Sequence, residues 1–381
     1  MSNLHLADFT VEDFLSNYWQ QKPVVIRQGF KNFEDLISPD ELAGLACEEE
    51  VESRLVYKTD GLWQAESGPF ESYAHLGEQG WCLIVQAVDH WAPEVAALVQ
   101  PFSFIPKWRF DDVMISYSTP GGGVGPHIDL YDVFICQGSG RRRWRVGDLG
   151  NHRQFAAHAA LLHTDPFDAI IDAELQAGDI LYIPPGFPHE GVSLEHSMSF
   201  SVGFRSKSAS HMLSGLADYL IDNELGTALI ADPKRPAHTQ QGRIDADDFA
   251  RIKAQMQAVL DDNALIADFA GSFLSKTKCE LDLQALDEPF YGRELVNELT
   301  RHSLNRLGGL RCFYVDETVS QGICYINGER YDLGAACHGA VLAICDTELL
   351  SYALLETWLK QPKLIDALTD WVNCGYWYFQ D

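Results

Sequence analysis

The chain has 381 residues, of which 46% are hydrophobic and 22% are charged, and its formal net charge is −27. This composition is typical of a globular protein with room for two or three domains. Because so acidic a surface repels phosphates, the charge argues against nonspecific binding to nucleic acid or to an anionic membrane. It is compatible with a basic protein partner, and equally with a plain role in solubility.

The cysteines and the first residues indicate an intracellular protein. The nine cysteines are odd in number and form no Cys-x-x-Cys pair, which predicts free thiols in a reducing cytosol. The opening MSNLHLADFTVEDFLSNYW has no basic segment followed by an apolar one, so no secretory signal is expected. No stretch approaches the roughly 18 consecutive apolar residues of a membrane span. We therefore expect a cytoplasmic protein without a membrane span.

The first half of the chain changes from one helix to many short strands. Residues 8–30 predict an amphipathic helix and then a short strand after Pro23, and Thr10 with Asp13 resembles a capping box. From about residue 52 to 204, short alternating or apolar runs are separated by glycine, proline and aspartate. Such runs predict an all-β sandwich or barrel. The expected strands cover residues 113–118, 131–137, 142–147, 179–184 and 197–204.

After Arg205 the pattern becomes helical. Apolar residues recur every three or four positions in residues 208–225 and 245–274. A polar, proline-containing linker at 231–244 separates these two segments.

The last region, from about residue 276, mixes helices with a β-hairpin. The dipeptide Asn327-Gly328 is the strongest short signal for a hairpin turn. Helices are expected at 347–361 and 362–374. A hairpin and helices in a segment of this size predict a small winged-helix-like module.

A histidine and an aspartate are spaced to share one face of a strand. His127 and Asp129 stand two residues apart, and Tyr131, Val133 and Ile135 continue the same face. An imidazole beside a carboxylate, without a thiolate, suits a divalent metal of intermediate hardness. Two histidines and one carboxylate with open positions form the facial triad of non-haem Fe(II) enzymes. This interpretation requires a second histidine from elsewhere.

His189 is the best candidate for that second histidine. It follows a buried strand at 180–183 and a Pro-Pro-Gly-Phe-Pro turn, whose prolines hold the backbone rigid at the strand end. Surface or structural roles are expected for the histidines of a polar, helix-like stretch and of a later loop, namely His152, His158, His163 and His196.

The sequence RRRWRV places one arginine on the inner face of a strand. Its residues alternate between a face with Arg142, Trp144 and Val146 and a face with three further arginines. The face with tryptophan and valine should point into the barrel. A buried arginine stays protonated and needs an anion, and its fork matches a carboxylate. Arg142 is therefore predicted to bind an anion, and the other arginines to form surface salt bridges.

Small polar residues on two strands predict a cavity. Ser199 and Ser201 alternate with large apolar side chains on the last expected strand, and Ser116 and Ser118 follow the same pattern on the first. Small polar residues inside a barrel leave space and hydroxyl donors for a ligand.

The glycine-rich GGGVG at 121–125 precedes the His-x-Asp pair. It lacks the Gly-Lys-Ser/Thr of a phosphate loop and comes before a strand rather than a helix. We expect a mobile lip at the mouth of the site.

Several motifs together resemble a known enzyme family. GPHID at 125–129, RRRWRVG at 141–147 and AGDILYIPPGFPHEG at 177–191 resemble the JmjC-type Fe(II)- and 2-oxoglutarate-dependent oxygenases. More narrowly, they resemble the bacterial ribosomal oxygenases of the RoxA/YcfD type, protein arginine hydroxylases. The segment FLSNYWQQKPVVIRQGF at 14–30 is similar to the N-terminal part of that family, and the resemblance covers the whole chain.

The resemblance implies a mixed, mainly β fold. The catalytic core would be a double-stranded β-helix, a jelly-roll or cupin-like JmjC domain, in residues 1–206 with the N-terminal helix. A helical dimerisation region in 207–275 and a winged-helix-like domain in 276–381 would follow. The resemblance thus implies a homodimer.

The resemblance also implies the cofactors and their ligands. Fe(II) would be held by His127, Asp129 and His189, with 2-oxoglutarate as cosubstrate and O2 as oxidant. Arg142 matches the basic residue that binds the distal carboxylate of 2-oxoglutarate. Many JmjC enzymes have lysine there, and arginine is typical of the bacterial ribosomal oxygenases. The serines predicted to line the same cosubstrate site are Ser116, Ser199 and Ser201.

The implied substrate is an arginine side chain of large-subunit ribosomal protein L-sixteen, hydroxylated at an unactivated carbon with release of succinate and CO2. A basic ribosomal protein and an acidic enzyme attract each other, chiefly to the benefit of the encounter rate. Asp111 and Asp112, expected near the glycine lip, and Tyr131 are candidates to receive the arginine.

Two alternatives stay open. A non-enzymatic ribosome-assembly or nucleic-acid-binding protein would act through its C-terminal module. From residue 276 onward, however, 9 lysines and arginines stand against 16 aspartates and glutamates, a formal −7, so no direct nucleic-acid binding is expected. A metal-dependent cupin isomerase would need more histidine and glutamate ligands than GPHIDLYD supplies.

Overall fold

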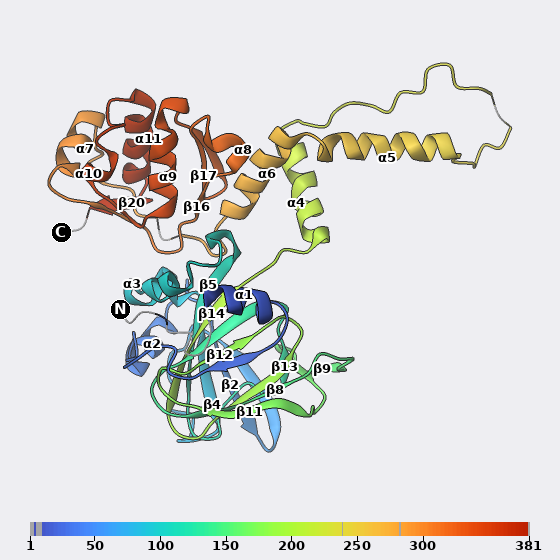
Figure 1. Ribbon diagram of the computed structural model, residues 1–381. Coiled ribbons are helices and arrows are strands. Elements are labelled where there is room, and N and C mark those ends of the chain that lie inside the picture. The colour runs from blue at the N-terminus through green and yellow to red at the C-terminus, as the bar shows by residue number, and fades with distance from the viewer. Residues whose placement is uncertain (1–3, 5–9, 238, 282, 380–381) are drawn as a thin grey trace. The chain divides into compact units, whose positions relative to one another are not determined.

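The computed structural model describes residues 4, 10–237, 239–281 and 283–379 of the chain. Internal contacts divide the chain into two units, Met1–Ser206 and Lys207–Asp381 (Figure 1). Each unit has its own hydrophobic core. The three-part division expected from the sequence stays a prediction.

The first unit is built from antiparallel strands in two main sheets. The eight strands of the large sheet are, in spatial order, β1 (Val24–Ile26), β12 (Ile180–Ile183), β7 (Asp132–Gln137), β14 (Ser197–Phe204), β5 (Phe110–Ser118), β4 (Trp81–Val85), β2 (Ser53–Thr59) and β3 (Leu62–Ser67). Those of the small sheet are β11 (Ala169–Leu175), β8 (Arg142–Gly147), β13 (Pro188–Ser193) and β6 (His127–Ile128). A separate hairpin pairs β9 (Gln154–His158) with β10 (Leu161–Thr164). The predicted double-stranded β-helix is confirmed.

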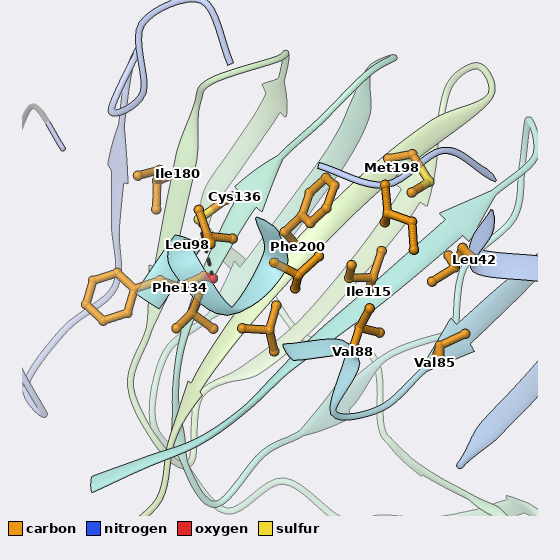
Figure 2. Close-up of a cluster of buried hydrophobic side chains, with 14 of the residues drawn as sticks. Leu42, Val85, Val88, Leu98, Ile115, Phe134, Cys136, Ile180, Met198 and Phe200 are labelled. Atoms are coloured by element: carbon orange, nitrogen blue, oxygen red, sulfur yellow. Dashed lines mark hydrogen bonds between the residues drawn. The ribbon is translucent and has the colours of Figure 1, made fainter. Parts of the chain in front are cut away.

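The large sheet has one apolar and one polar face, because side chains alternate along each strand. On β14, Met198 and Phe200 are fully buried in the main hydrophobic core. Figure 2 shows them there together with Ile115 of β5. The residues that alternate with them, Ser199 and Ser201, point to the opposite face and line a cavity there. The alternation therefore separates the structural core from the space left for a ligand.

Helices cover the apolar face of the large sheet. They are α1 (Val11–Asn17), α2 (Pro39–Leu45) and α3 (Pro93–Ala96). Phe14, Leu42 and Val95, one from each helix, belong to the main core. At the start of α1, the Thr10 hydroxyl accepts a hydrogen bond from the Asp13 N–H, and the Asp13 carboxylate accepts one from the Thr10 N–H. The predicted capping box is confirmed.

The strands predicted from the sequence are present as β5, β7, β8, β12 and β14. The helix-like interpretation of the stretch that contains His152, His158 and His163 is wrong. There β9 and β10 form a hairpin in which Leu162 pairs with Ala156. Alanine favours a helix locally. Tertiary packing overrides that preference, because Leu161 and His163 of β10 are buried.

The second unit combines helices with two three-stranded sheets. Its helices are α4 (Ala209–Asp222), α5 (Ala246–Leu260), α6 (Asn263–Ser275), α7 (Gly292–Leu299), α8 (Asp316–Val319), α9 (His338–Asp346), α10 (Tyr352–Leu355) and α11 (Pro362–Asn373). Its strands, in spatial order, are β19 (Leu349–Leu350), β15 (Leu304–Arg306) and β20 (Trp377–Phe379), then β16 (Cys312–Phe313), β17 (Ile323–Ile326) and β18 (Glu329–Asp332). The predicted C-terminal winged-helix module is confirmed.

The hairpin of this module turns where the sequence predicted. Asn327 and Gly328 connect β17 to β18 with φ angles of 48° and 89°. Both values lie in the left-handed region, which the Asn-Gly pair tolerates. α6 packs against β17, and the Tyr325 hydroxyl donates a hydrogen bond to Asp268 of α6 at 2.5 Å. Helix α6 therefore packs directly against this hairpin.

The helix predicted over 347–361 is only partly correct. Leu350 lies in β19, where it pairs with Leu304 of β15, and helix α10 covers only Tyr352–Leu355. The apolar residues of this stretch thus complete a sheet before the helix begins. Throughout the described part of the chain, no helix combines the length and apolarity needed to cross a membrane.

Candidate functional site

A cavity of about 200 Å³ lies between the two sheets of the first unit. The large sheet lines it with Ile84, Met114, Ser116, Ser199 and Ser201, among others. Facing them are residues of the small sheet, of the segment before it and of the β9–β10 hairpin, including Val124, His127, Asp129, Tyr131, Arg142, Trp144, His163 and His189. All the sequence-predicted ligand residues except Ser118, Asp111 and Asp112 line this one cavity.

His127, Asp129 and His189 are brought together at the end of the small sheet. His127 on β6 pairs directly with His189 on β13, and Asp129 follows β6 by one residue. Asp129 Oδ2 lies 3.8 Å from His127 Nε2 and 3.5 Å from His189 Nε2. Strand pairing therefore joins two motifs that are some sixty residues apart in the chain.

Backbone carbonyls orient both imidazoles. His127 Nδ1 lies 2.9 Å from the carbonyl oxygen of Gly125, and His189 Nδ1 lies 3.0 Å from that of Phe187. In a neutral ring the Nδ1–H donates to these carbonyls, which leaves the lone pair of each Nε2 turned toward Asp129. Burial, together with neighbouring His189, lowers the pKa of His127 to about 4, so His127 is neutral near pH 7.

Asp129 is an anion held by its neighbours. Burial raises the pKa of its carboxyl group, but the interactions with neighbouring His189 and His127 outweigh burial and lower the pKa to about 2. A carboxylate between two imidazoles is the donor set of a facial metal site. Among the described residues, this is the cluster of three or more metal-ligating side chains whose donor atoms lie within 4.8 Å of one another. The residues present fit a divalent metal ion.

Arg142 is buried in the same cavity, with 3% of its surface exposed. Its Nη1 donates to Ser116 Oγ at 3.0 Å and to Ser199 Oγ at 3.5 Å. Its Nε is buried and has no hydrogen-bond partner among the described residues. Burial lowers the pKa of the guanidinium. A buried cation with spare donors, facing a cavity, fits the distal carboxylate of a dicarboxylic acid.

The remaining arginines of RRRWRV face outward, as predicted. Arg143 makes a two-pronged salt bridge with Asp172, with both N–O distances at 2.7 Å. Arg145 Nη1 lies 2.7 Å from Glu190. The arginine cluster of the sequence is thus one inward cation and a row of surface ion pairs.

Asp111 and Asp112 do not lie near the glycine segment, so that expectation is wrong. They stand at the start of β5, and the glycines follow its end, a strand length of about 20 Å away. Both are buried. Asp111 forms an ion pair with Arg205 at 3.1 Å, and Asp112 accepts a hydrogen bond from the Ala87 N–H at 3.3 Å.

Tyr131 lines the cavity beside these acids. Burial raises the pKa of its hydroxyl, and the carboxylates of Asp129 and Asp112 raise it further, so the phenol stays protonated. The guanidinium of Arg205 stacks over its ring, with a centroid distance of 5.3 Å. Tyr131 and Asp112 therefore belong to one polar neighbourhood next to Asp129.

The glycine segment is not the mobile lip that the sequence suggested. Gly122 and Gly123 are buried. A Cβ on Gly123 would lie 2.2 Å from the Gly191 carbonyl oxygen and 3.8 Å from Arg142 Nη2. These glycines are needed because backbones pass closely, not because the segment must move.

Sequence reasoning missed one buried histidine. His163 on β10 lines the cavity and is 3% exposed, although its stretch was interpreted as polar and helix-like. The alternation Leu161-Leu162-His163 places Leu161 and His163 on one face and exposes Leu162, which is the period of a strand. This alternation could have shown that His163 points inward.

Two protein-family profiles match the chain in sequence order. The JmjC domain profile matches residues 97–212, and the ROXA-like winged helix profile matches residues 258–378.

Individual proteins match over nearly the full length. The chain is 46% identical over 369 residues to the ribosomal protein uL16 3-hydroxylase of Escherichia coli (strain K12), covering 97% of each chain. It is 31% identical to a probable ribosomal oxygenase of Haemophilus influenzae, covering 99% of each. The structure of YcfD, a ribosomal oxygenase from Escherichia coli, in complex with cobalt and 2-oxoglutarate superimposes with a TM-score of 0.92 at 44% identity, covering 100% of each chain. The chain therefore belongs to the JmjC-domain ribosomal oxygenases that carry a ROXA-like winged helix.

Proposed function

We propose that this protein hydroxylates an arginine side chain of ribosomal protein uL16, the L-sixteen protein named above, with release of succinate and CO2. Its broader class follows from its family: it is a 2-oxoglutarate-dependent oxygenase that uses Fe(II) and O2. The observation that carries the proposal is the cluster of His127, Asp129 and His189 in one cavity with the buried cation Arg142, whose Nε has no partner among the described residues.

We assign the metal to His127 Nε2, Asp129 and His189 Nε2. The carbonyls of Gly125 and Phe187 lie beside the Nδ1 atoms and orient both imidazoles. Because the pKa of His127 is lowered to about 4, its ring has no proton to lose near pH 7 before a metal binds. When bound, iron and 2-oxoglutarate supply the oxidising chemistry, and the chain supplies position and a dry site. The YcfD structure is a complex with cobalt and 2-oxoglutarate, and a divalent cobalt ion suits imidazole and carboxylate donors of the kind present here.

We assign the distal carboxylate of 2-oxoglutarate to Arg142, with Ser116 and Ser199 beside it. The two hydroxyls already contact the guanidinium and hold its fork in place. Ser201 lines the cavity one step further along β14 and offers another donor. Because Arg142 is buried, its attraction for a carboxylate is weakly screened by solvent.

We place the arginine substrate near Asp112 and Tyr131. The carboxylate of Asp112 is close enough to Tyr131 to contribute to the raised pKa of its phenol. The phenol lines the cavity together with the proposed metal ligand Asp129. Asp111, next to Asp112 on β5, forms an ion pair with Arg205, the residue that follows β14. This ion pair adds to the polar groups around Tyr131. The name of the Escherichia coli relative specifies 3-hydroxylation of uL16, so we expect the hydroxyl at carbon 3 of the target arginine.

Two further properties belong to the proposal. A net charge of −27 favours encounter with a basic ribosomal protein in the cytoplasm. An exposed apolar stripe on α5 supports a homodimer through the helical region. A nucleic-acid-binding or ribosome-assembly protein without enzymatic activity is less well supported, because the catalytic cavity and the JmjC match would then have no role.

The decisive experiment is an in vitro reaction with purified uL16. Protein, Fe(II), 2-oxoglutarate and O2 are incubated with uL16, and tryptic peptides are analysed by mass spectrometry together with succinate. We expect a gain of one oxygen atom on an arginine-containing peptide, matched by succinate. His127→Ala should abolish both products while circular dichroism stays unchanged. Uncoupled succinate without oxidised peptide would contradict the substrate assignment, and no succinate at all would contradict the oxygenase assignment.

A further inference from the structure

His163 is a buried imidazole with no role in the reaction described above. It lies on β10, 3% exposed, and its Nε2 is 2.8 Å from the Val124 carbonyl oxygen. Trp63 meets its ring edge-on at 4.8 Å between centroids, and Phe155 does so at 6.3 Å. Packing from both sides fixes the ring, so the contact with Val124 is set by the fold.

The backbone that His163 contacts leads directly to His127. A Cβ on Gly125 would lie only 2.4 Å from His163 Cε1, so Gly125 rests against the ring. The next residue of the hairpin, Thr164, donates its N–H to the Pro126 carbonyl at 2.9 Å. The Gly125 carbonyl is also the acceptor that orients His127 Nδ1, at 2.9 Å. One short segment thus joins the buried ring to a proposed metal ligand.

The protonation of His163 suits this contact. Burial lowers the pKa of the ring, so it is neutral near pH 7 and carries a single N–H. The Val124 carbonyl can only accept, and it therefore holds that proton on Nε2.

The hairpin that carries His163 is itself anchored. Arg54 of β2 donates from Nη1 to the Ala160 carbonyl, in the turn between β9 and β10, at 3.1 Å. The hairpin is thus tied to the large sheet through Arg54 and to the segment before β6 through His163 and Thr164. Because the hairpin is anchored, a shift of the His163 ring should also shift the backbone of residues 124–126, which precede His127.

We infer that His163 is a positioning residue for His127, acting through the backbone of Val124 and Gly125. We do not assign His163 as a metal ligand, because the ligand cluster found among the described residues comprises His127, Asp129 and His189. The inference rests on the proposed metal site. It predicts that loss of one hydrogen bond outside the site weakens metal binding inside it, as supporting partners of metal ligands do.

Cobalt(II) binding to the metal-free, full-length protein tests this inference without turnover. Affinity is measured by calorimetry and geometry by the visible spectrum of the bound ion, without 2-oxoglutarate. His163→Phe keeps an aromatic ring between Trp63 and Phe155 but removes the donor. We expect roughly 10-fold weaker binding and an altered cobalt spectrum. His163→Gln, whose amide N–H can reach Val124, should restore affinity to within about threefold of wild type.

Controls separate this idea from the proposed function. His152 also has a ring nitrogen beside a local carbonyl, that of Asp148, but on the surface, so His152→Phe should bind cobalt normally. If phenylalanine prevents folding, His163→Leu serves as a second donor-free variant, checked by circular dichroism. Wild-type affinity in both donor-free variants would overturn the inference, as would equal losses in His163→Phe and His163→Gln. No cobalt binding by the wild type would instead refute the proposed metal site.

Discussion

Arg142 and Arg143 are adjacent in the chain and opposite in energetic character. Arg143 is exposed and satisfied by Asp172 on both of its prongs. Arg142 is 3% exposed, contacts only serine hydroxyls by its Nη1, and has a buried Nε without a partner among the described residues. A buried cation without an anion lowers the stability of the folded protein, and a carboxylate bound beside it would offset that loss. Arg143 therefore links two strands at the surface, whereas Arg142 is a buried cation with a free Nε among the described residues.

Arg142→Met therefore has opposite effects with and without cosubstrate. Without 2-oxoglutarate, we expect an unchanged or higher melting temperature, because an apolar side chain of similar length replaces an uncompensated charge. With 2-oxoglutarate and cobalt, the variant should lose most of the ligand-induced stabilisation. Charge-assisted hydrogen bonds contribute about 2 kcal/mol each, so affinity should fall by roughly 30-fold or more. Thermal shift measured against 2-oxoglutarate concentration reports both effects.

Arg143→Met is the matched control for this measurement. Its side chain faces solvent on the same strand, so 2-oxoglutarate affinity should match the wild type. A large drop in melting temperature of cosubstrate-free Arg142→Met, or a normal response to 2-oxoglutarate, would contradict the assignment of Arg142.

Between the end of β5 and the start of β6, the glycine segment packs tightly against β13. Gly122 accepts a hydrogen bond from the Ser193 N–H, and the Gly121 N–H donates to the Ser193 carbonyl. Gly123 passes so close to Gly191 that a Cβ would lie 2.2 Å from the Gly191 carbonyl oxygen. A Cβ on Gly123 would also lie 3.8 Å from Arg142 Nη2, so this connection packs close to the buried cation.

Gly123→Ala should damage stability and cosubstrate binding together. The added methyl group must push β13 or the connection aside, and overpacking of this kind costs about 2 kcal/mol in the free energy of unfolding. Gly44→Ala in α2 is the control, because no atom lies within 4 Å of the added Cβ. Alanine favours the helix over glycine, so this variant should gain about 0.5 kcal/mol in the free energy of unfolding. Urea unfolding and 2-oxoglutarate titration measure the two effects. An undisturbed Gly123→Ala protein would show that the connection yields easily.

At the scale of the whole chain, α5 carries a row of exposed apolar side chains. Phe249, Ile252, Met256 and Leu260 follow one face at helical spacing, and they are exposed by 64%, 38%, 67% and 44%. No described residue of α5 is buried by the rest of the chain. A long apolar stripe on a helix is marginal in water alone, and a second copy of the same helix would cover it.

Phe249→Asp combined with Met256→Asp should convert a dimer to a monomer in light scattering after gel filtration. Two charges in the centre of an apolar contact are costly to bury, whereas on an exposed helix they cost little. Cobalt binding should be retained, because α5 contributes nothing to the cavity. Leu62→Asp, at a 69% exposed position on β3, should leave the oligomeric state unchanged. A monomeric wild type, or a dimeric double variant, would refute the proposed role of α5.

Local patterns predicted much of the fold. The capping box at Thr10 and the turn at Asn327-Gly328 depend on contacts within a few residues, and both are confirmed. The inward position of Arg142 follows from strand alternation alone. The predictions failed where distant contacts decide, as in the β9–β10 hairpin and the β19 strand, because pairing partners far along the chain outweigh local propensity.

The sequence was sufficient to identify the chemical class of this protein, because the motifs that contain His127, Asp129, His189 and Arg142 are specific in combination, although each alone is weak evidence. Only the tertiary structure brings the two histidines into register across β6 and β13. It also moves Asp111 and Asp112 away from the glycine segment and turns His163 toward the cavity. These outcomes depend on which strands pair and how closely their backbones pass, and long-range packing sets both.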